Sequence, residues 1–416
     1  MLPSTAWWRR CGASAERGAA RAWAVRAGRC RHGVGVRGVG VNGAGGGVAV
    51  RGVGPADEAE LLALAHPPRE PRAYRPALAM IGCGGIARHQ LAAYRTAGYH
   101  VTALCDRDVS RAEACRQAYY PDAQVFDDAQ ALLARCDAEV IDITTHPADR
   151  PALIEAALLA DRHVLSQKPF VLDLDVGDEL VALAKARGKV LAVNQNGRWA
   201  PHFALLRRLV AGGHVGAVTS LDMGLQFDHN WTAGTPFDDV HHLLLYDFAI
   251  HWFDMLLQLM GPRVPEQVSA STRRSPTQRA RPPLLAHATV GFADALATLS
   301  FNGDTHHAPW DRTTLVGSDA TVVSEGPDYD HQHVRVMRAS GTVEPALTGA
   351  WFDDGFHGAM AALLCAIEDG RPPTHAAAST LPSLELCFAA IASADRAGVP
   401  VVPGQVRRLP GPRGTG

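Results

Sequence analysis

Lysine is scarce in this chain of 416 residues. Only positions 168, 185 and 189 are lysines among 40 basic residues, so arginine supplies almost all of the positive charge. An ammonium group is a compact donor whose pKa can be drawn toward neutrality, whereas a guanidinium stays charged. A lysine that merely ends a strand is the common case, but the rarity of lysine makes Lys168 a candidate for a chemical role.

The chain also lacks the signals of a metal-binding, nucleic-acid-binding or membrane protein. Its eight cysteines include no C-x-x-C pair and no zinc-ligand spacing, which favours reduced, mostly buried thiols and a cytoplasmic location. The net charge of -2 gives no electrostatic argument for nucleic acid or an anionic membrane as a partner. No apolar run reaches the length of a membrane span.

The N-terminal segment differs in composition from the rest. Residues 1–54 contain nine arginines and thirteen glycines but one acidic residue, Glu16, and no amphipathic period. We expect this segment to be disordered, either as an over-extended start or, less favoured, as an export signal. Leucines within 56–67 predict a short helix that ends at Pro67. The remaining length favours two domains.

A glycine motif follows the first predicted strand. The apolar run 76–81 leads into Gly82-Cys83-Gly84-Gly85-Ile86-Ala87 and then a helical pattern, which is G-x-G-x-x-A at a strand-to-helix turn. The first glycine permits the tight turn, and the second lets a pyrophosphate approach the backbone at the helix N-terminus. The motif alone is also compatible with an ordinary turn.

Alternation of strands and helices continues to residue 195. The run 101–105 is a second buried strand ending in Asp106, at the spacing where an acid binds ribose hydroxyls. Strands at 140–144, 163–166 and 190–193 alternate with helices at 151–160 and 173–186, which predicts a doubly wound parallel sheet. Ligands bind at the carboxyl ends of such strands. The polar residues predicted at that edge are Thr144, Thr145, His146, Lys168 and Asn194.

The second half combines a polar-interrupted helix with a sheet. The predicted apolar helix 243–256 places Asp247 and His251 four residues apart on one face, with Asp254 close behind. A histidine on an apolar helix is more often a core residue than a catalyst. Short alternating strands at 267–271, 286–290, 295–300, 312–316, 321–323 and 335–337 predict an antiparallel sheet, closed by helices at 358–367 and 381–394.

Aromatic and polar residues gather between these segments. Carbohydrate sites combine aromatic faces with polar donors, and from this set we predict Arg198, Trp231 and His242 as substrate contacts. The histidine spacings match no recognised metal site, so we expect no metal. The other members of the set are Trp199, His202, Asp228, His229, Asn230, His241, His306, His307, Trp310 and Asp311.

Taken together, the motif order resembles the Gfo/Idh/MocA family, named for glucose-fructose oxidoreductase and inositol dehydrogenase. The matching features are the glycine motif, Asp106, the strand that ends near Thr144, the run His163-Val164-Leu165-Ser166-Gln167-Lys168-Pro169, and Asp247 with His251 and Asp254. The resemblance covers about residues 78–403. One departure is Gln167, where the family usually has Glu. The other is the segment after the threonine, where His146-Pro147 replaces the usual order and Arg150 takes a frequent histidine position.

The resemblance implies an NAD(P)-dependent oxidoreductase acting on a CH–OH group of a sugar, sugar derivative or cyclitol. It implies a Rossmann domain (75–195), then an α+β domain (196–406) whose mostly antiparallel sheet joins subunits into a homodimer or homotetramer. Lys168, Asp247 and His251 match the family's catalytic residues. The predicted cofactor-binding residues are Gly82, Gly84, Gly85, Ile86, Asp106, Arg107, Thr144, Thr145, Gln167 and Asn194.

The cofactor and the reaction class are less constrained. Asp106 would repel a 2′-phosphate and favours NAD, whereas Arg107 keeps NADP open. Besides a dehydrogenase, the motifs are compatible with a glycoside-cleaving enzyme that uses tightly bound NAD transiently. A non-catalytic dinucleotide-binding protein is a third alternative, although it would not need Lys168, Asp247 and His251 together. The sequence does not name the substrate.

Overall fold

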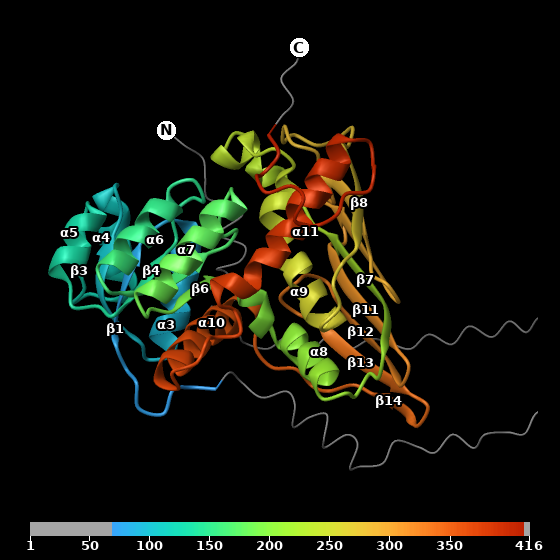
Figure 1. The fold of residues 1–416 in the computed structure, drawn as a ribbon, viewed down its shortest axis with the longest axis horizontal. Helices are drawn as coiled ribbons and strands as arrows, with labels where there is room; N and C mark the ends of the chain where they lie inside the picture. The colour runs from blue at the N-terminus through green and yellow to red at the C-terminus, as the bar shows by residue number, and fades with distance from the viewer. Residues whose placement is uncertain (1–68, 412–416) are drawn as a thin grey trace, which may run out of the picture. The chain divides into compact units, whose positions relative to one another are not determined.

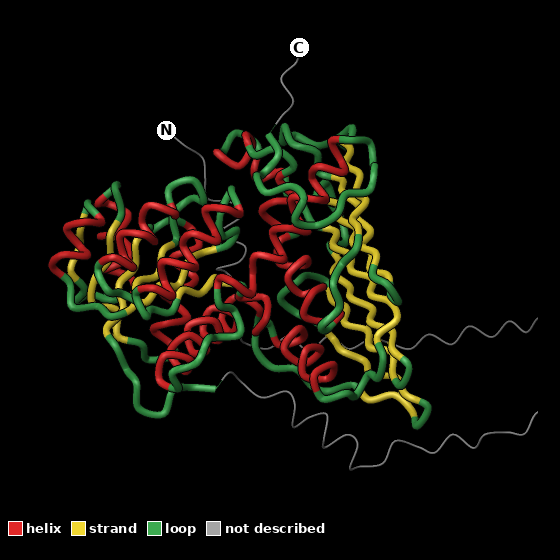
Figure 2. Tube along the Cα trace, in the orientation of Figure 1, coloured by secondary structure: helices red, strands yellow, loops and turns green. Residues whose placement is uncertain are grey.

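The computed structural model describes residues 69–411. The predicted disordered segment 1–54 and the helical pattern at 56–67 lie outside the described residues. Two sheets with their helices make up the described part (Figures 1 and 2).

The first sheet is parallel throughout and has the strand order β3-β2-β1-β4-β5-β6. Apolar runs such as Val140–Ile143 are buried along their whole length because helices pack on both faces of the sheet. The predicted doubly wound fold is therefore confirmed. The strands are β1 (Ala77–Ile81), β2 (His100–Cys105), β3 (Gln124–Phe126), β4 (Val140–Ile143), β5 (His163–Gln167) and β6 (Leu191–Asn194). The helices are α3 (Gly85–Thr96), α4 (Val109–Tyr119), α5 (Ala129–Arg135), α6 (Arg150–Leu159) and α7 (Leu174–Ala186).

The second sheet has eight strands in the order β14-β13-β12-β11-β7-β10-β9-β8. All neighbouring pairs are antiparallel except β7 and β10, which run parallel. The sequence prediction missed the central strand β7. Its Gly224 lies under the ring of Trp310, where an added Cβ would come within 3.0 Å of that ring. The strands are β7 (Val218–Gln226), β8 (Gln267–Arg273), β9 (Leu285–Gly291), β10 (Leu296–Asn302), β11 (Trp310–Gly317), β12 (Ala320–Gly326), β13 (His333–Arg338) and β14 (Gly341–Val343).

Helices lie on one face of this sheet, between it and the first domain (Figure 1). They are α8 (Pro201–Ala211), α9 (Ile250–Met260) and α11 (Ala377–Asp395), with short 3-10 turns η1 (Asn196–Trp199), η2 (Asn230–Thr232) and η3 (Pro236–Asp239). By length and composition α11 could cross a membrane, contrary to our expectation that no segment could. It is instead a core helix, since 72% of its apolar window is buried and it packs on α7, α9 and β8.

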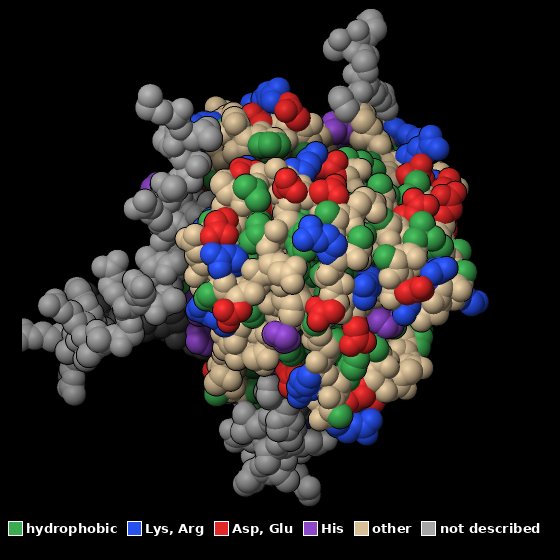
Figure 3. Space-filling model, turned by 90° about the vertical axis from the view of Figure 1, so that its left-hand side faces the viewer, with side chains coloured by type: hydrophobic (Ala, Val, Ile, Leu, Met, Phe, Trp, Pro, Cys, Tyr) green, Lys and Arg blue, Asp and Glu red, His purple; other side chains and the backbone are tan. Residues whose placement is uncertain are grey.

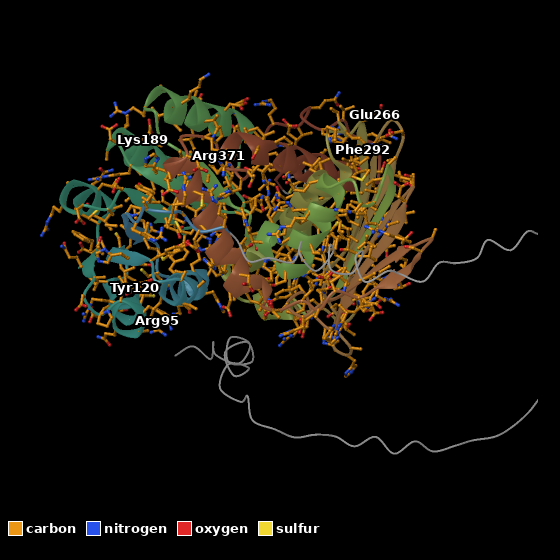
Figure 4. All side chains as sticks on the ribbon, turned by 90° about the horizontal axis from the view of Figure 1, so that it is seen from below. Arg95, Tyr120, Lys189, Glu266, Phe292 and Arg371 are labelled. Carbon is orange, nitrogen blue, oxygen red and sulfur yellow. The ribbon has the colours of Figure 1, made fainter. Side chains whose placement is uncertain are left out.

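Helix α10 (Trp351–Glu368) returns from the second sheet to the first domain and packs against α3. Its Met360, Leu363 and Leu364 share a hydrophobic core with Leu78 and Met80 of β1. A boundary at residue 195 therefore does not separate the two cores. Figure 4 shows the side chains of this helical layer, with Tyr120 and Arg95 on the outer side of the first domain and Glu266 and Phe292 near the second sheet.

The predicted helix 243–256 is not continuous. Residues Leu244–Phe248 form a π-helical turn, η4, in which the amide of Ala249 donates to the carbonyl of Leu244 at 2.7 Å, and α9 begins only at Ile250. Turns of this kind are rare and frequently occur at functional sites. This one carries Asp247.

Candidate active site

The glycine turn after β1 is held in a conformation that requires glycine. Gly82 has a φ of +100°, and its amide donates to the carbonyl of Cys105 at 2.7 Å. A Cβ at Gly82 would lie 2.8 Å from Oγ1 of Thr144 and 3.0 Å from the amide nitrogen of Thr145. The hydroxyl of Thr144 donates to the carbonyl of Gly82 at 2.5 Å. Thr144 therefore fixes the turn from the neighbouring strand β4.

The N-terminus of α3 is open where an anion would bind. Gly84 is its N-cap, no side chain caps the helix, and the first turn, which includes Gly85 and Ile86, contains no acidic residue. A Cβ at Gly84 would meet nothing within 4 Å, so the space above the turn is unfilled by the protein. Uncapped amides at a helix N-terminus suit a phosphate group. These residues therefore fit the pyrophosphate of a dinucleotide.

Asp106 lies at the end of β2, beside the glycine turn. Its Oδ2 accepts from the amide of Cys83 at 2.7 Å, and its Oδ1 accepts from the amide of Asp108 at 2.9 Å. Each oxygen keeps a second acceptor site, so the carboxylate can still bind ribose hydroxyls. Arg107 next to it is 87% exposed, and its guanidinium pairs with Asp149 at 3.2 Å.

Two predicted cofactor residues at the strand ends have buried polar atoms without a protein partner. Both amide atoms of Asn194 and the hydroxyl of Thr145 make no hydrogen bond within the described part of the chain, and Asn194 is 0% exposed. Buried polar groups are rarely left unpaired. The unpaired atoms therefore mark places where a cofactor or substrate can supply the missing partners.

Lys168 follows β5 directly and reaches across to the π-helical turn. Its Nζ donates to the carbonyl oxygen of Asp247 at 2.8 Å and lies 3.5 Å from Oδ1 of the same residue. The two side chains are 16% and 19% exposed. Burial lowers the pKa of Lys168, Asp247 opposes that shift, and the charge of Arg150 adds to it. The ammonium is thus held in a partly closed site and is more acidic than a surface lysine.

Both departures from the family pattern have a structural role. The guanidinium of Arg150 is buried and donates to the carbonyls of Thr145 and Gln167, which ties together the ends of β4 and β5. The amide of Gln167 accepts from the backbone of Lys168 at 2.7 Å and donates to Oε1 of Gln90 at 3.2 Å. A carboxylate could not make both contacts. The side chain of Gln167 therefore links the backbone of Lys168 to Gln90 on α3.

His251 lies in the first turn of α9, close enough to Lys168 for the ammonium charge to affect the pKa of the imidazole. Burial, and then the charge of Lys168, hold the pKa of His251 well below its usual value. Its Nδ1 is buried without a partner among the described residues, and its ring meets Trp351 edge-on at 5.5 Å. The imidazole is therefore neutral at pH 7. Trp351, at the start of α10, was not in the predicted site because its contact depends on how α10 returns.

Aromatic rings border the lysine on the side of the second sheet. The ring of His229 lies against that of Phe248, with centroids 3.7 Å apart and a tilt of 36°. Burial and the charge of Lys168 lower the pKa of His229 to about 3, although a hydrogen bond to the backbone of Asp228 opposes that shift. Trp231 meets Phe237 at 5.5 Å and Phe248 at 6.3 Å. The structure thus places the predicted Trp231 beside the turn that carries Asp247.

Asp311 on β11 pairs with Leu225 of β7, and both residues are buried. It is 1% exposed, and no side chain donates a hydrogen bond to it. Burial and the nearby Asp328 raise its pKa to about 8. At neutral pH its carboxyl group is mostly protonated and can donate as well as accept.

Two predicted substrate contacts are wrong. Arg198 is 0% exposed and forms a double hydrogen bond with Asp254 at 2.6 and 2.7 Å, which makes it a buried structural ion pair between η1 and α9. His242 uses Nε2 on Asp395 at 2.9 Å and Nδ1 on Thr272 at 3.2 Å, so neither ring nitrogen is directed at a substrate. Sequence spacing gave no sign of these partners because they lie far away along the chain.

Comparison with protein-family models identifies two matching regions. Residues 77–195 match the oxidoreductase family with an NAD-binding Rossmann fold, and residues 203–323 match the GFO/IDH/MocA C-terminal domain. A D-apiose dehydrogenase of Paraburkholderia graminis is 30% identical over 185 residues, which is 44% of this chain and 49% of that protein. An inositol 2-dehydrogenase of Burkholderia multivorans is 27% identical over 224 residues, 51% of this chain and 64% of that protein. The chain therefore spans about half to two thirds of the length of these curated relatives.

Solved structures share the fold over most of the chain. An oxidoreductase from Agrobacterium radiobacter in complex with NAD+, L-tartaric acid and magnesium superposes with a TM-score of 0.71 at 21% identity, over 79% of this chain and 99% of that one. An aldose-aldose oxidoreductase from Caulobacter crescentus superposes with a TM-score of 0.67 at 17% identity, over 79% and 99%. Identities this low establish the fold alone.

Proposed function

Because this chain belongs to the Gfo/Idh/MocA family of NAD-binding oxidoreductases, we propose that it transfers a hydride between a nicotinamide and a carbinol carbon of a sugar, sugar derivative or cyclitol. The observation that carries the proposal is the position of Lys168. Its ammonium lies against Asp247 in a partly buried site near His251, at the carboxyl edge of the dinucleotide-binding sheet. A protein that only bound a dinucleotide would not need this arrangement.

The residues that would hold the cofactor are those around the open glycine turn. The α3 N-terminus with Gly84 suits the pyrophosphate, Asp106 the ribose hydroxyls, and Asn194 and Thr145 offer unpaired atoms further along the same edge. A bound nicotinamide supplies the acceptor or donor of the hydride.

Two side chains can manage the proton that a carbinol hydroxyl loses as its carbon becomes a carbonyl. The imidazole of His251 is neutral and so has a ring nitrogen that can accept that proton, while burial and the charge of Lys168 lower its pKa and limit its strength as a base. Nζ of Lys168 can donate a hydrogen bond to the same oxygen and stabilise alkoxide character. The carboxylate of Asp247 holds the ammonium in place at 3.5 Å.

Sugar recognition is supported by the aromatic residues close to the turn that carries Asp247. The side chains of Trp231, Phe248 and His229 supply apolar surface of the kind that the C–H groups of a sugar contact. Pockets that combine apolar faces with a few oriented polar groups are typical of small-molecule sites.

The proposal is tested with the full chain and a panel of polyols, aldoses and glycosides, followed by nicotinamide absorbance. We expect steady NADH formation with at least one polyol or aldose, and no signal above background with Lys168→Ala. Cleavage of a glycoside without net NADH would instead support the transient-oxidation alternative. NAD binding without any turnover on the panel would contradict the proposal.

The choice between NAD and NADP is tested by the two dissociation constants. We expect tighter binding of NAD, since Asp106 opposes a 2′-phosphate and Arg107 is engaged by Asp149. Asp106→Ala should narrow the difference, whereas tighter binding of NADP by the parent protein would contradict this expectation.

We also propose that two copies of the chain associate through the face of the second sheet that α8, α9 and α11 leave uncovered. That face carries polar pairs such as Thr298 with Asp222 and Arg335 with Glu325. Light scattering should report a dimer or tetramer, and a monomer at micromolar concentration would contradict this proposal.

A further inference from the structure

We propose that His241, His242 and Asp395 form a binding site for a divalent transition-metal ion of the zinc class. The two histidines lie just before the π-helical turn η4, and Asp395 is the last residue of α11. Within residues 69–411 this is the one group of three such side chains whose ligand atoms all lie within 4.8 Å of one another.

The two imidazoles converge on a single oxygen. Nε2 of His241 lies 3.0 Å and Nε2 of His242 lies 2.9 Å from Oδ1 of Asp395, and the two ring centroids are 4.1 Å apart. Two imidazole nitrogens and one carboxylate oxygen make up a ligand set that suits zinc and its neighbours, with positions left for water. Mg²⁺ and Ca²⁺ prefer oxygen ligands throughout.

The backbone is arranged to bring these rings together. Side chains of consecutive residues usually point apart, but His242 has a φ of +48°, in the left-handed region that histidine seldom adopts. Residues that keep such an uncommon backbone conformation often serve a function. Here it turns both Nε2 atoms toward the same carboxylate.

The surroundings favour a cation. Nδ1 of His242 is 3.2 Å from the hydroxyl of Thr272 on β8, a contact that fixes the ring and leaves Nε2 as the nitrogen facing the site. The negative end of the α11 dipole lies at Asp395. His241, Asp395 and His242 are 21%, 15% and 6% exposed, so the site is partly open to an ion from solvent.

A bound ion would brace the segment that carries Asp247. The carbonyl of His242 accepts from the amide of Tyr246 at 3.0 Å, one residue before Asp247. The ion would thus connect the start of η4 with the end of α11, and Thr272 would extend that connection to β8. Binding itself can be measured without any substrate, so its outcome is independent of the proposed hydride transfer.

The test uses the full chain freed of metal with EDTA. It is titrated with Zn²⁺ by calorimetry and with Co²⁺ by visible absorption, in the parent, in His241→Ala and in Asp395→Asn. His100→Ala, which changes an exposed histidine on β2, is the matched control. His241 is partly exposed, so its truncation should leave the fold intact, which circular dichroism would verify.

We expect one ion per chain in the parent, a Co²⁺ spectrum typical of mixed nitrogen and oxygen ligands, and no competition by millimolar Mg²⁺. Affinity should fall about 10-fold or more in His241→Ala and Asp395→Asn, and stay unchanged in His100→Ala. Zn²⁺ should raise the melting temperature of the parent but not of the two site variants. No saturable binding by the parent, or equal affinity in parent and site variants, would overturn the proposal.

Discussion

Gly82 and Gly84 are two residues apart in one turn, yet substitution by alanine should have different consequences. At Gly82 the φ of +100° and the contact of 2.8 Å with Thr144 Oγ1 leave no room for a Cβ. We expect Gly82→Ala to lower the free energy of unfolding by about 2–3 kcal/mol, combining the backbone strain with the displacement of Thr144. In a chain of this size that lowers the melting temperature by roughly 5 °C.

Gly84 has a φ of -77° and an open space beyond it. Gly84→Ala should therefore change the free energy of unfolding by less than about 0.5 kcal/mol. The added methyl group projects into the space that a pyrophosphate would use, so NAD affinity should fall about 10-fold or more, which is about 1.4 kcal/mol.

The measurements are thermal unfolding without cofactor and NAD titration by calorimetry at a temperature where both variants are folded. Gly188→Ala is the matched control. It changes a glycine with a φ of +62° and open space after α7, and should lower stability by about 1 kcal/mol while leaving NAD affinity unchanged. The reasoning is refuted if Gly84→Ala destabilises the protein as much as Gly82→Ala, or if it binds NAD as tightly as the parent.

Four further predictions concern the site. Lys168→Ala should lower kcat by a factor of about 10² to 10⁴ with nearly normal NAD affinity, and full activity in Lys168→Arg would show that the ammonium has no special role. Since burial and Lys168 lower the pKa of His251, the enzyme should lose activity on acidification only well below pH 6.5. This acid limb of the pH–rate profile should be absent in His251→Ala, and an unchanged limb would mean that another group causes it. Gln167→Glu should lower the free energy of unfolding by about 1–3 kcal/mol in urea titrations, because a carboxylate there would face Oε1 of Gln90, and an unchanged midpoint would contradict the assigned hydrogen bonds. Folding raises the pKa of Asp311 from 3.8 to about 8, so the folded state loses stability relative to the unfolded state as pH rises from 4 to 8. Asp311→Asn should therefore be about as stable as the parent near pH 4 and more stable by a few kcal/mol near pH 8. A gain in stability that shrinks with rising pH would refute the pKa shift.

Local patterns were enough to predict most of the first domain, but not its edge strand β3 or the helices α4 and α5. Strands such as β1 and β4 are largely apolar and buried, and the glycine turn is defined by residues adjacent in sequence, so neither depends on distant contacts. The position of Lys168 could also be predicted from the sequence, because a residue that directly follows a strand of a parallel sheet lies on its ligand edge.

Predictions that depended on distant partners were less successful. The strand β7 was missed although it is central, since Asp222 and Gly224 weaken its apolar pattern and only its neighbours β10 and β11 define it. A continuous helix was expected where the hydrogen bond from Ala249 to Leu244 forms a π-helical turn. The roles of Arg198 and His242 were misassigned because their partners, Asp254 and Asp395, lie 56 and 153 residues away.

The sequence by itself therefore determined the parallel sheet, the glycine turn and a lysine at its ligand edge, since periodicity and turn chemistry act over a few residues. The tertiary structure decided which polar side chains meet. It returned α10 to place Trp351 against His251, paired Arg198 with a buried acid, and brought two neighbouring histidines to the end of α11. Such encounters follow from the packing of whole helices and sheets, which no spacing between residues along the chain specifies.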